Sequence, residues 1–256
     1  MISPGSTFVF VGGLHRSGTS LLTRCLAEHP DVSAFSGTGV PEDEGQHLQD
    51  VYPPAYAHGG PGRFGFDPEA HLTEDSPLAS PENAERLLEQ WVPHWESSRS
   101  VMIEKSPPNL IRSRFLQALF PRARFVMIVR HPVPVTLATQ RWSKTSEDEL
   151  VDHWVRCHEL WAADATHLRH ARTIRYEDFV ADPQATMDNL WSWVGLTPVR
   201  LDFMEVRRDV NAKYFDQWRE RHPGVRGWWH RHRLGRRAER AWSGQVTSKE
   251  IHLKQR

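Results

Sequence analysis

The chain has little cysteine, no net charge and no long hydrophobic run, and each shortage excludes a class of protein. Its two cysteines, Cys25 and Cys157, lie far apart and show no metal-ligand spacing, so neither a disulfide framework nor a cysteine-bound metal is expected. Lys plus Arg and Asp plus Glu each number 32, so no overall field favours nucleic acid as a partner. No stretch approaches about twenty apolar residues, and no basic, apolar leader opens the chain. We therefore expect a cytoplasmic protein without a signal peptide or membrane span.

The composition is typical of one soluble globular domain covering residues 1–256. Hydrophobic residues make up 39% of the chain and charged residues 25%, which suits a protein with a buried core. Basic charge is concentrated in residues 221–256, which hold ten Lys and Arg against two Glu. We interpret this segment as a solvated face, and contact with an anionic ligand, nucleic acid or a membrane surface is the alternative.

Apolar runs alternate with helix-like stretches, which predicts a three-layer α/β fold with a central parallel sheet between crossover helices. Strands are expected at residues 7–11, 100–103, 124–129 and 172–175. Helices are expected at about 19–28, 81–91, 108–120, 147–168, 176–180 and 184–194, and from 132 onward. Residues 36–81 are rich in Gly and Pro and too long for a plain connection, so we expect a functional insertion with short helices. Beyond residue 194 the sequence is poorly periodic.

A glycine-rich turn links the first expected strand to the first expected helix. Residues 11–20 read Val-Gly-Gly-Leu-His-Arg-Ser-Gly-Thr-Ser. Glycines in this setting allow the backbone to curl, so that several N–H groups and the helix dipole face one anion. Because strand, turn, helix, Arg16 and paired hydroxyls occur together, we favour a phosphate site over a glycine turn without a ligand.

The turn has the Walker A spacing from Gly13 to Gly18, but Thr19 stands where that motif has its lysine. Without the lysine, a nucleoside triphosphatase lacks its main contact to the β- and γ-phosphates. The apolar run 124–129 is followed by Arg130 and His131 rather than by a magnesium-binding Asp. These departures argue against a small-molecule kinase, which is the nearest alternative on the same architecture.

Polar or charged residues follow every expected strand. The glycine loop follows the first, Glu104-Lys105-Ser106-Pro107 the second, Arg130-His131-Pro132 the third and Tyr176-Glu177-Asp178 the fourth. Ligands of open parallel sheets bind beyond the carboxyl ends of the strands. A shared anionic ligand is therefore the simplest explanation of this pattern.

The string GLHRSGTSLL resembles the 5′-phosphosulfate-binding loop of sulfotransferases that use 3′-phosphoadenosine 5′-phosphosulfate (PAPS), especially the branch with tyrosylprotein sulfotransferases and many bacterial enzymes. His29-Pro30-Asp31-Val32 also matches this branch, and the resemblance covers most of residues 8–193. It implies a P-loop-NTPase-like sulfotransferase fold, PAPS as donor, 3′-phosphoadenosine 5′-phosphate (PAP) as product, and no metal. Arg16 would contact the transferred group. The donor-binding loop residues that it implies are Gly13, His15, Arg16, Ser17, Gly18, Thr19 and Ser20.

The resemblance extends to residues at two other strand ends. Lys105 is similar to a lysine that stabilises negative charge on the sulfuryl group and its bridging oxygen. Arg130 is similar to an arginine that grips the 3′-phosphate through its planar guanidinium. The family usually has Ser eight residues after that arginine, whereas this chain has Ala138. Thr139 or Thr136 would then supply the hydroxyl, or the contact is missing.

Two shorter matches complete the implied donor site. Tyr176, in Ile-Arg-Tyr-Glu-Asp, resembles an element that contacts the adenine or the 3′ side of the nucleotide, and a core tyrosine is the alternative. Lys213, in Asn-Ala-Lys-Tyr, resembles a late lysine that closes over the donor.

The resemblance also implies a general base, because the acceptor must lose a proton while it attacks sulfur. Cytosolic members use a His after the second-motif strand, where this chain has Lys105-Ser106-Pro107. The tyrosylprotein and glycosaminoglycan branches use a Glu after the first helix, and Glu44 aligns best with it. Glu42 and Asp43 are alternatives, and a solvated acidic loop is the other interpretation. The implied catalytic residues are Glu44, Arg16 and Lys105.

The expected function is transfer of a sulfuryl group from PAPS to a hydroxyl, or less favourably an amine, of a small-molecule, sugar or lipid acceptor. Residues 36–81 and 221–256 would bound the acceptor, and peptide tyrosine is a further candidate. A non-catalytic nucleotide-binding protein is the alternative from another class. Ala138 favours that alternative, while Arg16, Lys105 and Glu44 oppose it.

Overall fold

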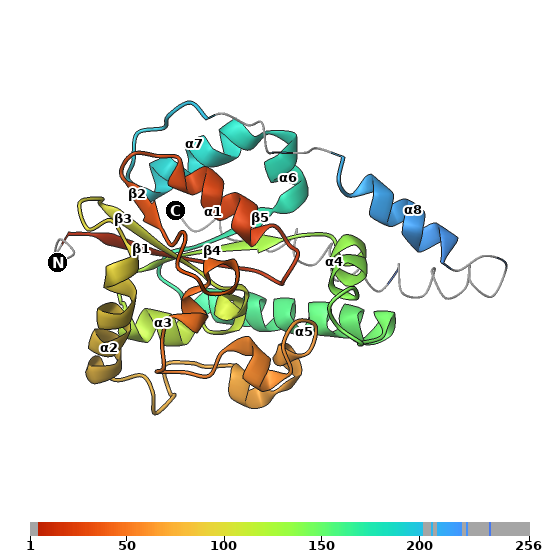
Figure 1. Ribbon diagram of the computed structural model, residues 1–256, viewed down its shortest axis with the longest axis horizontal. Coiled ribbons are helices and arrows are strands. Elements are labelled where there is room, and N and C mark those ends of the chain that lie inside the picture. Colours follow the sequence, from red (N-terminus) through yellow and green to blue (C-terminus); the bar gives the residue numbers. More distant parts are fainter. Residues whose placement is uncertain (1–4, 202–205, 207–208, 222–223, 225–235, 237–256) are drawn as a thin grey trace.

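The computed structural model describes residues 5–201, 206, 209–221, 224 and 236, and a parallel sheet lies at its centre (Figure 1). Within those residues the sheet has five strands in the order β2-β3-β1-β4-β5, and every neighbouring pair is parallel. The strands are β1 (Thr7–Gly12), β2 (Val32–Ala34), β3 (Val101–Lys105), β4 (Arg124–Val129) and β5 (Ala171–Arg175). The predicted central parallel sheet is therefore confirmed.

Strand β1 occupies the middle of the sheet because its side chains are apolar on both faces. Val9, Phe10 and Val11 are each 2% exposed or less. Val11 pairs with Lys105 of β3 on one side and with Val126 of β4 on the other. The glycine loop that follows β1 therefore begins between the carboxyl ends of β3 and β4.

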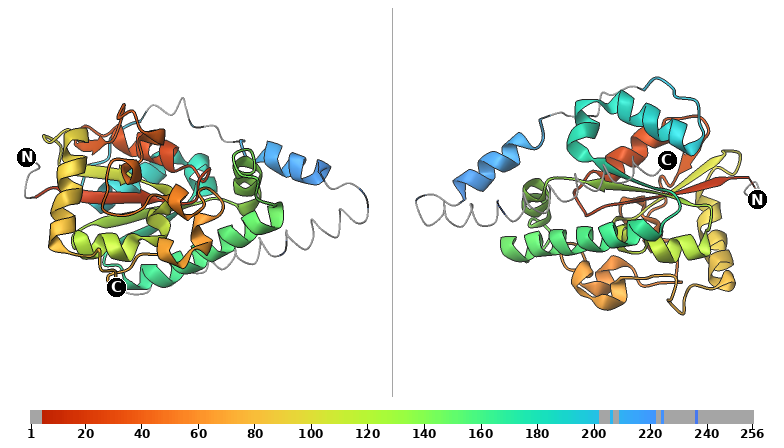
Figure 2. Two further views of the ribbon diagram at one scale, coloured as in Figure 1. Left: turned by 60° about the horizontal axis from the view of Figure 1, so that its bottom comes forward. Right: turned by 180° about the vertical axis from the view of Figure 1, so that it is seen from behind.

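Helices cover both faces of the sheet, which confirms the predicted three layers (Figures 1 and 2). On one face lie α1 (Thr19–Ala27), α6 (Tyr176–Ala181) and α7 (Pro183–Val194), and on the other α3 (Ser113–Leu119) and α5 (Glu147–Asp164), with α2 (Pro81–Trp91) at the edge. Leu22, Ile128 and Phe179 belong to the buried cluster on the first face. Phe125 and Trp154 belong to the cluster on the second.

The 36–81 insertion is packed firmly on the second face. It forms short 3-10 helices, as predicted, at Pro41–Asp43, Gly45–His47, Ala55–His58, Phe64–Phe66 and Pro68–Ala70. Arg112, which is 1% exposed, donates hydrogen bonds to the carbonyl oxygens of Pro53 (2.9 Å) and Ala70 (3.3 Å). The fully buried Phe64 shares a core cluster with Trp154 of α5. These contacts hold the insertion beside the carboxyl end of the sheet.

Two predicted helices are wrong in their extent. The expected helix at 108–120 is a 3-10 helix, Pro107–Ile111, followed by α3, because Arg112 between them has a non-helical φ of −127°. The expected helix at 147–168 ends at Asp164 and continues as a 3-10 turn, Ala165–His167. No helix among the described residues is long and apolar enough to cross a membrane.

Two elements have no counterpart in the sequence prediction. Strand β2 has three residues, which is too short for a periodic pattern. Helix α8 (Ala212–Glu220) packs Tyr214 and Trp218 against α4 (Pro132–Thr139). The predicted basic segment 221–256 lies outside the described residues, apart from residues 221, 224 and 236.

Candidate functional site

The glycine loop folds so tightly that two of its positions exclude any side chain. Gly13 has a φ of 147°, and a Cβ there would lie 2.4 Å from the carbonyl oxygen of Ile128. Gly18 has a φ of 103°, and a Cβ there would lie 2.7 Å from the ring of Tyr176. Arg16, between them, also has a left-handed φ of 69°. The loop geometry therefore depends on both glycines.

The start of α1 presents hydrogen-bond donors that fit an anion. Gly18 is the N-cap and supplies no side-chain cap, and the first N–H groups of a helix have no partners within the helix. The hydroxyl of Ser17 is buried and has no hydrogen-bond partner. Such donors, together with the positive end of the helix dipole, bind phosphate. The predicted phosphate-binding residues Ser17, Thr19 and Ser20 come together at this point.

Arg16 lies exposed at the tip of the loop. Its guanidinium carbon is 4.4 Å from the ring centroid of Trp142, a side chain that is 57% exposed. A cation–π contact of this kind stabilises an exposed arginine by about 0.5–1 kcal/mol. Trp142 thus restrains the residue predicted to contact the transferred group. The sequence prediction missed this tryptophan.

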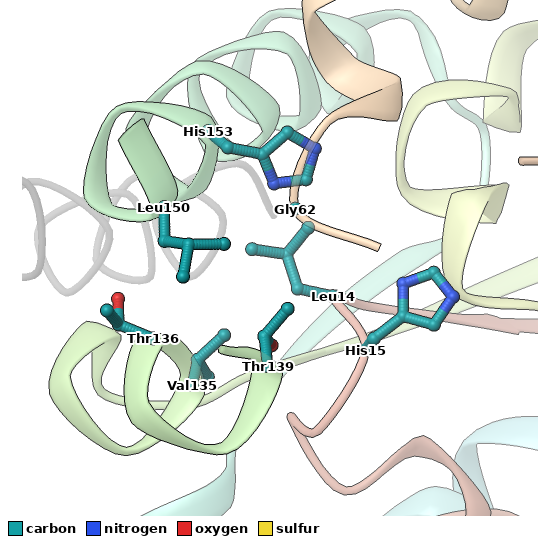
Figure 3. A pocket seen from close by; sticks show the side chains of 8 residues that line it. All are labelled: Leu14, His15, Gly62, Val135, Thr136, Thr139, Leu150 and His153. Carbon is teal, nitrogen blue, oxygen red and sulfur yellow. The ribbon is translucent and has the colours of Figure 1, made fainter. Parts of the chain in front are cut away.

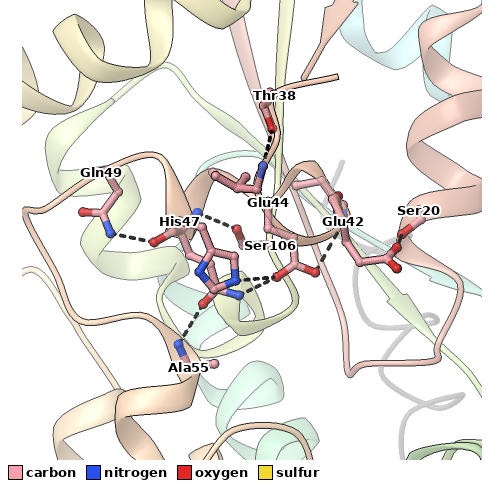
Figure 4. A network of polar contacts seen from close by, with 12 residues as sticks. Ser20, Thr38, Glu42, Glu44, His47, Gln49, Ala55 and Ser106 are labelled. Carbon is pink, nitrogen blue, oxygen red and sulfur yellow. Dashed lines mark hydrogen bonds and ion pairs between the residues drawn. The ribbon is translucent and has the colours of Figure 1, made fainter. Parts of the chain in front are cut away.

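Lys105 and Glu44 form a buried ion pair beside the loop. Figure 4 shows the polar contacts around Glu44. Their side chains are 5% and 7% exposed, and Nζ of Lys105 lies 3.4 Å from Oε1 of Glu44. Nζ also donates a 2.6 Å hydrogen bond to the carbonyl oxygen of Glu42. The structure therefore brings two of the three predicted catalytic residues into contact, although they are distant in sequence.

The second carboxylate oxygen of Glu44 is held by its own chain neighbours. Nε2 of Gln46 donates to it at 2.5 Å, and Nε2 of His47 lies 3.8 Å from it. The backbone N–H of Gln46 donates to Oγ of Ser106 at 3.0 Å, and that hydroxyl donates to Oε1 of Glu104 at 2.6 Å. This hydrogen-bonded chain fixes the orientation of the Glu44 carboxylate. The prediction missed the roles of Gln46, Ser106 and Glu104.

Two carboxyl groups in this network have raised pKa values. Burial raises the pKa of Glu44, and the Lys105 ammonium opposes part of that rise. A carboxylate with a raised pKa accepts a proton more readily near neutral pH. Burial also raises the pKa of Glu104 to about 7. Glu44 therefore has the environment of a base, whereas Glu104 is enclosed and supports its neighbours.

Arg130, the residue after β4, is buried against Tyr176. Its guanidinium carbon is 4.2 Å from the Tyr176 ring centroid, and Nη1 donates to the carbonyl oxygen of Arg16 at 2.9 Å. Nε and Nη2 both donate to Oδ1 of Asn211, at 2.9 and 2.6 Å. Across the described ranges, no carboxylate forms an ion pair with Arg130. A buried cation with neutral partners favours a bound anion.

Asn211 connects α8 to this arginine. Its Nδ2 donates to Oε1 of Glu177 at 2.7 Å, so the amide contacts both Arg130 and Glu177. The ring of Tyr214 lies 5.6 Å from the Arg130 guanidinium carbon, and Nζ of Lys213 lies 5.0 Å from that ring. The structure thus brings Arg130, Tyr176 and Lys213 together, and the sequence analysis had assigned no role to Asn211 or Glu177.

His15 and Thr139 line a small cavity of about 10 Å³ between the loop, α4 and α5 (Figure 3). The His15 ring centroid lies 5.9 Å from that of Phe64, and burial lowers the pKa of His15 to about 4, so this imidazole is neutral. Ala138, at the family's serine position, packs with Tyr214 of α8. The structure therefore places His15 and Thr139 at this cavity, and their contact with a donor stays a prediction.

A larger groove of about 300 Å³ lies on the other side of the loop from Arg130. It is lined by Ser20, Thr23, Arg24, Ala27 and Glu28 of α1, Ala34, Phe35 and Ser36 at the end of β2, Glu42, Asp43 and Lys105. The hydroxyl of Thr23 is buried there without a partner. Because β3 and β2 lie on one side of β1, and β4 and β5 on the other, the loop separates this groove from Arg130.

A sequence model of the sulfotransferase family matches residues 9–199. Protein-tyrosine sulfotransferase 2 of Gallus gallus is 25% identical over 198 residues, which cover 74% of this chain and 51% of that protein. Protein-tyrosine sulfotransferase 1 of Danio rerio is 34% identical over 122 residues, which cover 48% of this chain and 32% of that protein. The chain thus spans about half, or less, of the length of these curated relatives.

Two solved structures of sulfotransferases have a similar fold. The sulfotransferase from Alicyclobacillus acidocaldarius has a TM-score of 0.50 at 18% identity, covering 85% of this chain and 92% of that one. The sulfotransferase domain from the curacin biosynthetic pathway has a TM-score of 0.55 at 16% identity, covering 95% of this chain and 99% of that one. These likenesses confirm the predicted P-loop-like sulfotransferase fold. Since the family match covers most of the chain, this protein belongs to the sulfotransferase family.

Proposed function

We propose that this protein transfers a sulfuryl group from PAPS to a hydroxyl of a small-molecule, sugar or lipid acceptor, with amines less favoured. The observation that carries the proposal is the buried Glu44–Lys105 pair beside a glycine loop that has no Walker lysine. A phosphate loop of this kind suits a donor phosphate, and the pair supplies a base next to a cation. Membership in the sulfotransferase family supports the same reaction.

The proposed donor site runs from the start of α1 to α8. Backbone N–H groups of residues 17–20, with the hydroxyls of Ser17, Thr19 and Ser20, would hold the 5′-phosphate. Arg130 would bind the 3′-phosphate, since its buried guanidinium has only neutral partners. The side chains of Tyr176 and Lys213 would flank the nucleoside. The fit rests on the unpartnered Ser17 hydroxyl at one end and on Arg130 at the other.

The proposed reaction is a direct in-line displacement. The acceptor oxygen forms a bond to sulfur as the bond between sulfur and the bridging phosphate oxygen breaks, and PAP leaves with that electron pair. Glu44 takes the acceptor proton on its carboxylate. Arg16 and Lys105 stabilise negative charge on the sulfuryl oxygens and on the leaving phosphate. The step needs neither a metal ion nor a covalent enzyme intermediate.

Among the three candidate bases, the contacts favour Glu44. Its carboxylate is buried against the Lys105 ammonium, and burial raises its pKa. The Glu42 carboxylate is exposed and accepts a hydrogen bond from Ser20 at 3.2 Å. Asp43 accepts two hydrogen bonds from Thr38, which lower its pKa. Glu42 and Asp43 are therefore poorer proton acceptors in this arrangement.

The acceptor side of the site is proposed to be the groove of about 300 Å³ that Lys105 and the 36–81 insertion border. It lies across the loop from Arg130, as in-line attack on a bound donor requires. The named activity of the curated relatives makes peptide tyrosine the second candidate acceptor.

The low cysteine content, with both described cysteines free and buried, supports a cytoplasmic location.

The test is transfer of label from ³⁵S-labelled PAPS to a panel of phenol, sugar, aliphatic alcohol and amine acceptors. Glu44→Gln should lower turnover by about 10²–10⁴-fold, the usual contribution of a general base, while PAP affinity stays within about twofold. Glu85→Gln, which removes an exposed carboxylate of α2, is the matched control. Tight PAP binding without transfer to any acceptor would support a non-catalytic binding protein. Preference for ATP over PAP would support a kinase.

A further inference from the structure

One residue of the insertion, Glu42, contacts two groups that the proposed donor needs. Its side-chain Oε2 accepts a 3.2 Å hydrogen bond from the hydroxyl of Ser20 in the phosphate loop. Its carbonyl oxygen accepts the 2.6 Å hydrogen bond from Nζ of Lys105. Figure 4 shows Glu42 between Ser20 on one side and Glu44 on the other. A carboxylate and a carbonyl of the protein thus bind donors that are proposed to bind phosphate and sulfuryl oxygens.

The segment that carries Glu42 is anchored at both ends. Before it, the ring of Phe35 stacks on Trp95, with centroids 4.8 Å apart and planes at 23°. After it, the carbonyl oxygen of Gly45 accepts a 3.0 Å hydrogen bond from the Trp91 indole. A Cβ at position 45 would lie 2.5 Å from the Glu104 side chain. These contacts hold the residues on either side of residues 37–43, which we call the 37–43 segment.

The 37–43 segment contains its own hinge. Gly37 and Gly39 have left-handed φ values of 65° and 83°, and a Cβ at either position would meet nothing within 4 Å. At the other end, Glu42 and Asp43 have φ values of 53° and 50° in succession. Left-handed conformations are unfavourable for residues with a Cβ, so contacts must hold this pair in place. The Ser20 and Lys105 bonds to Glu42 are two of those contacts.

We propose that the 37–43 segment closes the empty donor site, with Glu42 as an internal substitute for the donor's anionic group. This inference rests on the proposed function. Binding of the donor's 5′-phosphosulfate moves the Glu42 carboxylate off Ser20, because two negative groups cannot share this hydroxyl, and it displaces the neutral Glu42 carbonyl oxygen from Lys105. The segment then turns about Gly37 and Gly39, and Glu42 and Asp43 leave their unfavourable conformation. Glu42 thereby weakens donor binding. It also couples donor binding to the rearrangement of the 37–43 segment, which directly precedes Glu44.

The first test is the affinity of PAP for the whole chain, measured by titration calorimetry. Glu42→Gln should tighten PAP binding by about fivefold. This is the change in affinity that corresponds to removing the repulsion between two like charges about 4 Å apart in water. Glu42→Ala, which also removes the acceptor of the Ser20 bond, should tighten it at least as much. Glu85→Gln should leave it unchanged. Unchanged or weaker binding in both Glu42 variants overturns the inference, whereas PAP binding to none of the proteins overturns the proposed function.

The second test uses hydrogen exchange, which reports movement directly. The N–H of Thr38 donates to Oδ1 of Asp43 at 2.8 Å, and the N–H of Glu44 donates to the carbonyl oxygen of Pro41 at 3.1 Å. Saturating PAP should accelerate exchange of these amides, although it protects the glycine loop. In Glu42→Ala they should exchange fast before PAP is added. Protection of the 37–43 segment by PAP in the unmodified protein would contradict release and overturn the inference.

Discussion

Replacing Lys105 by Met separates two roles that the buried ion pair gives this lysine. In the unmodified protein, burial raises the pKa of Glu44 and the nearby ammonium opposes the rise. An opposite charge at 3.4 Å, the Nζ–Oε1 distance, lowers a carboxyl pKa by about 1–3 units. Lys105→Met therefore raises the pKa of Glu44 further, because burial then acts without the opposing ammonium. The base works only when it is ionised. As the pH is lowered, the variant should therefore lose activity at a higher pH than the unmodified protein does.

The assay is kcat/KM for ³⁵S transfer between about pH 5 and 9, with an acceptor that the unmodified enzyme uses. The acid limb should move upward by about 1–3 pH units in Lys105→Met. At high pH, where Glu44 is ionised in both proteins, a residual loss of about 10²–10³-fold should remain. That residual loss measures how much Lys105 stabilises negative charge on the transferred group in the transition state. Lys144→Met, which removes an exposed lysine, should change neither quantity.

The result that refutes this reasoning is an acid limb that stays in place or moves to lower pH. Such a limb would mean that Glu44 is not the group whose ionisation controls the reaction. Circular dichroism must show a folded variant across the range, because removing one partner of a buried pair leaves an uncompensated charge. Glu44→Gln provides the companion measurement, since it should abolish the limb altogether.

Three further perturbations test other parts of the site. Arg130→Lys keeps the charge but loses the planar contacts, so PAP affinity should fall by about 10- to 100-fold while AMP, which lacks the 3′-phosphate, changes little. Gly13→Ala places a Cβ 2.4 Å from the Ile128 carbonyl at a φ of 147°, and urea unfolding should show a loss of about 1–3 kcal/mol or more. Burial raises the Glu104 pKa from 4.5 to about 7, so the folded state binds a proton that the unfolded state has released. Stability should therefore fall as pH rises from about 4.5 to 7, by about 3 kcal/mol, and Glu104→Gln should remove this decline in urea midpoints. A parallel pH dependence in the Gln variant would contradict this assignment.

The sequence was sufficient for the parts of the site that depend on local patterns. The glycine loop needs one strand, one turn and one helix in succession, and Lys105 and Arg130 follow apolar runs directly. The parallel sheet then places them together because its strands all end at one edge. These positions could be predicted without knowing how distant segments pack.

The remaining site residues depend on contacts between distant segments. Gln46 and Trp142 have no motif of their own, and each matters only because the chain folds it against Glu44 or Arg16. Asn211 reaches Arg130 across 81 positions of sequence. Strand β2 was missed because three residues are too few to show a period. Helix α8 was missed because only Tyr214 and Trp218 of its nine residues are buried.

The hydrogen bond from Arg130 to the carbonyl oxygen of Arg16 ties the two ends of the proposed nucleotide site into one body. Tyr176 strengthens the tie, since its ring lies under Arg130 and also fills the space beside Gly18. The distance between the two phosphate positions is then set by the protein before any nucleotide arrives. Selectivity toward nucleotides becomes a matter of length as well as charge, because a ligand whose two phosphates are spaced differently cannot satisfy the loop and Arg130 together.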